Sequence, residues 1–185
     1  AHYNLGVLAE RAGVPQVARQ HYADAIKAQP DFSPALLALT RYSIRSKDER
    51  GALSRIEDKL RESPENIGLL NAKSRLLISL KEQPTEVIRL AKLVLRSDEQ
   101  NVYAMIHLAA AFFQQKKYEL SIAILKNAKE LDPTNPEIYA RLSEGHSALS
   151  ESLLARLALE EAVKQPGGSS AEIHNQLGLL YHKTG

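Results

Sequence analysis

The chain has 185 residues, 44% of them hydrophobic and 25% charged, which is ordinary for a globular domain. Its 24 Lys and Arg residues nearly balance its 22 Asp and Glu residues, and the formal net charge of +2 argues against a dedicated nucleic-acid-binding protein. The absence of cysteine excludes disulfide bonds, thiol catalysis, and zinc or iron–sulfur sites that depend on cysteine.

Prolines recur at a nearly constant spacing and divide the sequence into similar units. Pro30 and Pro64 are 34 residues apart, and Pro64 and Pro133 are 69 apart, which is one interval of 34 and one of 35. A column of small residues keeps the same period and lies at Gly6, Thr40, Ser74, Ala109, Ser143 and Gly178. A fixed period of this length is the sequence signature of a repeat architecture.

Each unit shows helical periodicity in two segments that a short turn joins. Apolar residues recur every three or four positions, most clearly over 102–113 and 118–131. No segment has the pattern of a β-strand. We therefore predict an all-α chain of about 11 helices, in repeats that cover approximately 1–32, 33–66, 67–101, 102–135 and 136–170, followed by a final helix over 171–185.

The small, aromatic and proline positions of these units resemble the tetratricopeptide repeat, a helix–turn–helix unit of about 34 residues. In the first unit the family pattern reads His2, Leu5-Gly6, Ala9, Ala18, Tyr22, Ala25 and Pro30. In the fourth unit it reads Met105, Leu108-Ala109, Phe112, Ser121, Leu125, Ala128 and Pro133. The resemblance extends over the whole chain and implies a right-handed superhelix, or α-solenoid, of antiparallel helix pairs.

Two features depart from a complete and regular array. Lys73 occupies a position that in the other units is Leu5, Leu39, Leu108, Leu142 and Leu177. The last helix, 171–185, is amphipathic, whereas a complete array usually ends in a polar capping helix. We therefore expect the chain to be a fragment of a longer protein; the alternative is that 171–185 is itself the cap.

The sequence contains no recognisable constellation for catalysis. It has neither a Gly-x-Ser-x-Gly elbow nor a glycine-rich phosphate loop, and none of its six histidines forms His-Glu-x-x-His. His174 and His182 are eight residues apart, too far along one helix to share an ion, and we interpret His2 as a packing residue in place of the family's Trp. We predict no catalytic residues, no cofactor, no metal site and no enzymatic activity.

The resemblance also implies where a partner binds, because in the family the first helix of each pair lines a concave face that receives peptides or partner helices. The positions of this chain that match that face form the candidate groove. We expect the groove to contain Arg11, Leu37, Arg41, Arg45, Asn71, Arg75, Tyr103, Ile106, Phe113, Glu137 and Glu144.

Charge along this candidate groove is uneven. Residues 1–92 hold 15 basic and 11 acidic side chains, whereas residues 93–185 hold 9 and 11. We expect a groove that runs from basic through aromatic to acidic, and a ligand whose acidic part lies toward the N-terminal repeats, since Arg suits carboxylate recognition. The alternative is that these charges form an ordinary solvated face.

The leading hypothesis is a non-catalytic scaffold that binds a peptide or helix of a partner protein. The alternatives are a recruiting segment of a larger enzyme or of a bacterial envelope, secretion or motility assembly, and a self-assembly module that pairs through exposed terminal helices. Nucleic acid is not an expected partner. The sequence shows no apolar run long enough to span a bilayer and no signal peptide, and it does not choose between cytoplasm and periplasm.

Overall fold

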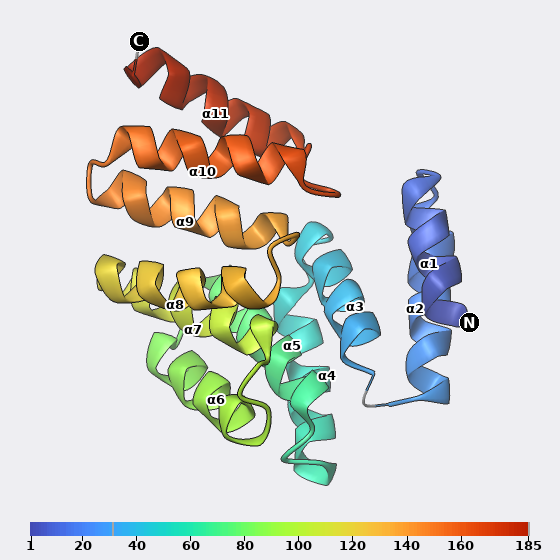
Figure 1. Cartoon of the computed structure of the whole chain (residues 1–185). Helices are drawn as coiled ribbons and strands as arrows, with labels where there is room; N and C mark the ends of the chain where they lie inside the picture. The colour runs from blue at the N-terminus through green and yellow to red at the C-terminus, as the bar shows by residue number, and fades with distance from the viewer. Residues whose placement is uncertain (31, 185) are drawn as a thin grey trace. The chain divides into compact units, whose positions relative to one another are not determined.

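The computed structural model describes residues 1–30 and 32–184. Over these residues the chain forms eleven α-helices and no strand, which confirms the predicted all-α fold (Figure 1). The helices are α1 (His2–Arg11), α2 (Pro15–Ala28), α3 (Ser33–Arg45), α4 (Glu49–Glu62), α5 (Ile67–Leu80), α6 (Pro84–Ser97), α7 (Val102–Gln114), α8 (Tyr118–Leu131), α9 (Pro136–Ala148), α10 (Ser152–Lys164) and α11 (Ala171–Thr184).

The helices form two compact units, and the boundary between them falls within the last turn of α6. The first unit is Ala1–Val94, and the second begins at Leu95. In the first unit α1 packs on α2 and α4 on α5, while α3 contacts both α2 and α5. In the second unit each helix from α7 to α11 packs on the next one along the chain.

Asparagine begins several of these helices. The side-chain oxygens of Asn66 and Asn101 accept the backbone N–H groups of Leu69 and Ala104, at 2.9 and 3.0 Å. The amide of Asn135 does the same at the start of α9. Each such cap satisfies a donor that the helix leaves unpaired, and its loss costs about 1 kcal/mol.

Each tight turn within a helix pair contains a residue with a left-handed backbone. These residues follow the 34-residue period and are Gly13, Lys47, Lys81, Lys116 and Ser150, with φ between 56° and 74°. Only the first is glycine, so the other four side chains adopt a conformation that L-amino acids rarely take. In the pairs α1–α2, α7–α8 and α9–α10, the two helices that such a turn joins pack closely against each other.

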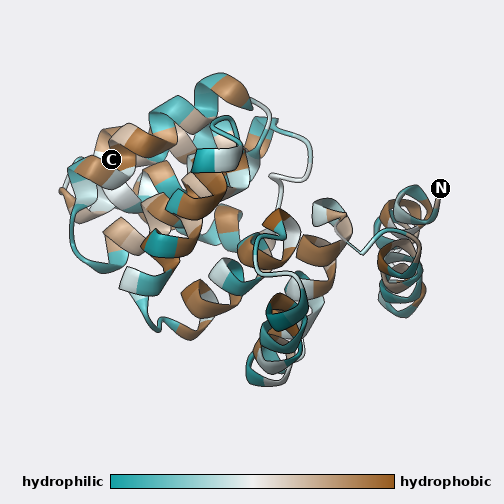
Figure 2. Ribbon diagram, turned by 90° about the horizontal axis from the view of Figure 1, so that it is seen from below, coloured by the Kyte–Doolittle hydropathy of each residue, from teal (hydrophilic) through white to brown (hydrophobic). Residues whose placement is uncertain are grey.

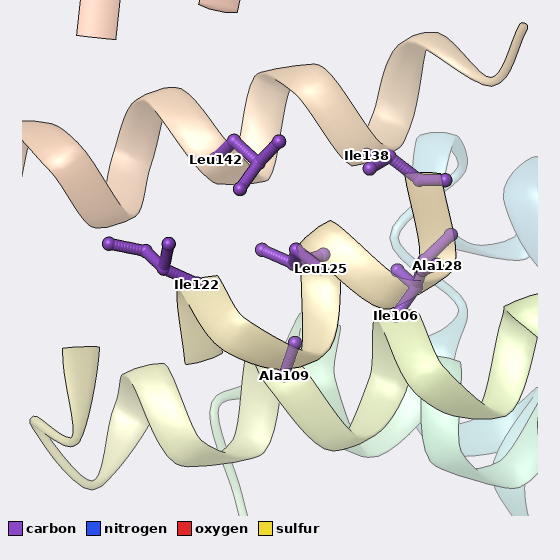
Figure 3. Close-up of a cluster of buried hydrophobic side chains, with 7 residues drawn as sticks. All are labelled: Ile106, Ala109, Ile122, Leu125, Ala128, Ile138 and Leu142. Carbon is purple, nitrogen blue, oxygen red and sulfur yellow. The ribbon is translucent and has the colours of Figure 1, made fainter. Parts of the chain in front are cut away.

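The core of the second unit lies between three successive helices. Figure 3 shows Leu125 of α8 between side chains of α7 and of α9, and its side chain has no exposed surface. The cluster comprises Ile106, Ala109, Ile122, Leu125, Ala128, Ile138 and Leu142. Alanines on α7 and α8 let the helices approach, and the larger residues fill the remaining space. Figure 2 shows hydrophobic and hydrophilic residues alternating along the helices, as the amphipathic pattern requires.

Aromatic rings pack around Tyr22 in the first unit. The ring of Tyr22 is fully buried and lies 5.6 Å from the ring of Tyr3 and 6.2 Å from that of Tyr42, measured between centroids. Gly6 of α1 makes room for it, because a β-carbon at that position would lie 2.5 Å from Cε1 of Tyr22. Glycine is therefore required at this position by packing, not by backbone conformation.

The structure explains why lysine replaces leucine at position 73. Lys73 Nζ lies 3.0 Å from a carboxylate oxygen of Glu57 on α4 and 3.8 Å from one of Glu86 on α6. The Lys73 side chain is only 17% exposed, so its aliphatic stem fills part of the space that leucine fills elsewhere. One residue thus links the three helices α4, α5 and α6.

We expect Lys73→Leu to leave the free energy of unfolding within about 1 kcal/mol of the wild type, because apolar burial offsets the lost ion pairs. Lys73→Gln should destabilise the first unit by about 1–2 kcal/mol, since it removes the cation that pairs with Glu57 and adds a polar amide, while Glu86 keeps its ion pair with Arg89. Urea titration followed by circular dichroism compares the two variants. Equal losses of unfolding free energy in the two variants would show that the ion pairs of Lys73, and not its packed aliphatic stem, determine stability here.

Candidate functional site

Glu10 on α1 contacts two of the arginines that were predicted to line the groove of the first unit. Its carboxylate accepts a hydrogen bond from the Tyr22 hydroxyl at 2.8 Å and one from Nη2 of Arg41 at 3.3 Å. Nη1 of Arg45 lies 3.8 Å from the other carboxylate oxygen. Because Glu10 is on α1 and both arginines are on α3, these contacts bring the two first helices of successive pairs together.

The surroundings of the two tyrosines in this cluster keep their hydroxyl groups protonated. Burial, and then the hydrogen bond to Glu10, raise the pKa of Tyr22 well above its ordinary value, so the phenol stays protonated and remains a donor. Burial also raises the pKa of Tyr42. The Glu10 carboxylate faces the guanidinium groups of Arg41 and Arg45. The Arg45 side chain is 66% exposed, so its remaining N–H donors are accessible to an external anion.

The remaining predicted residues of the first unit divide into exposed and buried ones. Arg11 is exposed at the end of α1, and Arg75 on α5 is half-buried. Leu37 and Asn71 are 3% and 1% exposed, which corrects the expectation that they line an open groove. Both point into the packed interior, because α3 and α5 pack against each other and cover these positions.

The predicted aromatic patch of the second unit is smaller than expected. Tyr103 is 36% exposed, as a contact residue should be. Ile106, in contrast, is 1% exposed and belongs to the core between α7, α8 and α9, which corrects its assignment to the groove. Phe113 is half-buried, with its ring 5.2 Å from that of Tyr118 on α8.

The predicted acidic end contains a cation that the sequence analysis did not single out. Arg141 lies between Glu137 and Glu144 on α9, with guanidinium nitrogens 3.3 and 3.6 Å from their carboxylate oxygens. Desolvation raises the pKa of Glu144, and the charge of Arg141 opposes that rise. The spacing of four and three residues is the sequence signal that identifies such helical ion pairs.

A pocket of about 240 Å³ opens beside Glu144, between α9 and α11. Three of its lining residues, Glu144, Ser147 and Leu179, occupy positions that match the inner face of the family. Leu179 is an exposed hydrophobic residue. The whole lining is Ser143, Glu144, Ser147, Gln176, Leu179 and Leu180. This pocket combines apolar side chains with one carboxylate, and an apolar side chain of a ligand fits it.

A further pocket, of about 260 Å³, lies among α2, α3, α4 and α5 and includes none of the predicted groove residues. Its walls include Ile26, Leu36 and Ile56, and the cations Arg19 and Lys59 also line it. The sequence did not indicate this pocket, because its walls come from four helices that repeat periodicity alone does not bring together.

No helix within the described residues combines the length and the hydrophobicity that a bilayer crossing requires.

Comparisons with known proteins agree with the architecture. The solved structure of TTC0263, a thermophilic TPR protein from Thermus thermophilus, matches 98% of this chain and 97% of its own, with a TM-score of 0.75 and 17% identity. The family model described as tetratricopeptide repeat matches residues 88–136. Residues 88–136 therefore contain a tetratricopeptide repeat, and the chain has the fold of tetratricopeptide-repeat proteins. This confirms the resemblance that the repeat columns indicate.

Two further relatives of this tetratricopeptide-repeat chain carry functional descriptions. Protein O-mannosyl-transferase TMTC3 from Homo sapiens is 27% identical over 151 residues, which are 82% of this chain. The chain spans only 16% of that protein's length. The solved structure of YrrB, described as a TPR protein with an unusual peptide-binding site, matches 98% of this chain and 89% of its own, with a TM-score of 0.55 and 15% identity.

Proposed function

We propose that the chain is a non-catalytic protein-interaction scaffold that binds a peptide or helix of a partner protein along the first helices of its repeats. The observation that carries the proposal is the pair Arg41 and Arg45 on α3, which surround a single carboxylate, Glu10, and keep guanidinium donors toward solvent. The tetratricopeptide-repeat fold and the peptide-binding site in the description of YrrB support this function.

The charges favour an acidic ligand segment at the first unit. Arg11, Arg41, Arg45 and Arg75 all come from first helices, and Arg41 and Arg45 share the single carboxylate of Glu10. Guanidinium groups recognise carboxylates through paired hydrogen bonds, which are stronger than those between neutral groups. The first unit accordingly receives aspartate and glutamate side chains of the partner.

At the second unit the ligand contacts differ in kind. Tyr103 offers an exposed aromatic ring, and the pocket between α9 and α11 accepts an apolar side chain. Glu144 lines that pocket, and Arg141 on the same helix forms ion pairs with both Glu144 and Glu137. The second unit therefore binds an apolar residue with polar neighbours.

The test is a peptide selected on the wild-type chain by phage display, labelled with fluorescein and measured by fluorescence anisotropy. We expect Arg41→Glu combined with Arg75→Glu to weaken binding by at least about tenfold, because reversed charges repel the acidic segment. The control is Arg61→Glu combined with Lys92→Glu, which makes the same change of charge at exposed positions on the second helices α4 and α6. Unchanged affinity in the first double variant, with its helicity intact, rejects the assignment.

A second candidate function is the recruitment of substrates or partners within a larger enzyme. The observation that favours it is the similarity to a part of the O-mannosyl-transferase TMTC3. The full-length reading frame decides the matter: a transferase domain in the same polypeptide supports recruitment, and an array of repeats without one supports the independent scaffold.

A further inference from the structure

Three side chains with metal-ligating atoms gather at one end of the first helix pair. His2 is the first residue of α1, and His21 and Asp24 lie three positions apart on α2, on the same face of that helix. One ligand atom from each residue lies within 4.8 Å of the other two. The short turn between α1 and α2 makes the helices antiparallel, which brings the start of the first helix against the second half of the next.

One oxygen of the Asp24 carboxylate is available to a cation. Lys27 Nζ and Gln20 Nε2 both donate to its Oδ1, each at 3.1 Å, and no hydrogen bond in the described part of the chain involves its Oδ2. Lys27 and Gln20 therefore orient the carboxylate through Oδ1, and Oδ2 is the oxygen that a metal ion can reach.

His21 supplies an independent indication. Its Nδ1 is shielded from solvent and has no hydrogen-bond partner in the described structure, a condition that buried polar nitrogens rarely meet. The ring of His2 lies near it, with centroids 6.0 Å apart and planes inclined by 36°. His2 itself is exposed, which corrects its interpretation as a packing residue and leaves its ring free to turn.

We propose that His2, His21 and Asp24 form a binding site for a divalent transition-metal ion of the zinc class. Two imidazole nitrogens and one carboxylate oxygen suit Zn²⁺, Co²⁺ or Ni²⁺, whereas Mg²⁺ and Ca²⁺ prefer oxygen ligands alone. Three protein ligands leave a fourth position for water.

Only side chains have to move for the three ligand atoms to reach one metal ion. Bond lengths of about 2.0–2.2 Å around zinc place its ligand atoms about 3.3 Å apart, so the separation of up to 4.8 Å closes by roughly an ångström or two. His2 is at a helix terminus, and Lys27, which is 73% exposed, can leave Asp24 without breaking any packing. The bound ion would connect the first turn of α1 to α2 and stabilise this helix pair, since metal binding adds to folding.

The experiment is isothermal titration of the full chain with ZnCl₂ in a buffer that does not chelate metals, together with thermal unfolding. We expect one saturable site per chain and a raised unfolding temperature. His21→Ala and Asp24→Asn should each weaken binding by at least about tenfold. The matched control is His174→Ala on α11, which removes an exposed histidine far from α1 in the sequence and should leave the affinity unchanged.

Two further measurements establish which groups ligate the metal. Co²⁺ in place of Zn²⁺ should give visible absorption bands that Asp24→Asn alters, and acetylation of the Ala1 amine should leave the zinc affinity unchanged. Absence of saturable binding, or equal affinity in His21→Ala, Asp24→Asn and the wild type, overturns the proposal. Loss of binding on acetylation overturns it as well, because the terminal amine would then be the ligand.

Discussion

Leu125→Ala is expected to lower the free energy of unfolding of the second unit by about 3 kcal/mol, within the usual range of about 2–5 for such a truncation. The Leu125 side chain has no exposed surface and lies between α7 and α9, where no neighbour can collapse into the space without moving a helix (Figure 3). The variant therefore loses both the burial of the leucine and the contacts of the residues around it.

Urea titration monitored by far-ultraviolet circular dichroism measures the loss. Leu120→Ala is the matched control, because it makes the same chemical change on the same helix at a position that is 44% exposed. We expect the control to change stability by less than about 1 kcal/mol. If both variants lose the same amount, Leu125 is not the packing centre that connects the three helices.

Gly6→Ala is expected to destabilise the first unit by about 1–3 kcal/mol, although alanine is the better helix former by about 1 kcal/mol. A β-carbon at Gly6 would lie 2.5 Å from Cε1 and 2.7 Å from Cδ1 of the buried Tyr22 ring. The ring must then move, and its hydrogen bond to Glu10 is lost or distorted.

Gly178→Ala provides the internal comparison, since Gly178 occupies the same column of the repeat as Gly6. No atom lies within 4 Å of the place where its β-carbon would be. This variant should gain about 0.5–1 kcal/mol from helix propensity alone. Thermal unfolding of both variants tests whether Gly6→Ala lowers the stability and Gly178→Ala raises it. A destabilised Gly178→Ala would contradict the open space around Gly178 on α11.

The repeat period alone was sufficient to predict the helices. Spacing by 34 residues, with apolar positions every three or four, led to about 11 helices, and the structure has eleven in its described part. The columns also identified core residues correctly, among them Ala18, Tyr22 and Leu125, none of which has exposed surface. Local periodicity determines such positions, because any helix in a stacked array must bury the same face.

The side chains of the candidate site were predicted less completely. Leu37, Asn71 and Ile106 follow the periodicity of the inner face, yet all three are buried. A residue near the edge of an amphipathic stripe is covered or open according to how closely the next helix packs, and this distance depends on all the side chains between the two helices.

The sequence by itself determined the repeat fold, the helices and the number of charged residues on each first helix. Only the tertiary structure decided which charges meet: Glu10 with Arg41 and Arg45, and Lys73 with carboxylates from two other helices. The same is true of His2, whose neighbour His21 is 19 positions away along the chain. Helical periodicity is a local property that neighbouring residues specify, whereas ion pairs and ligand clusters depend on the packing angle and distance between helices.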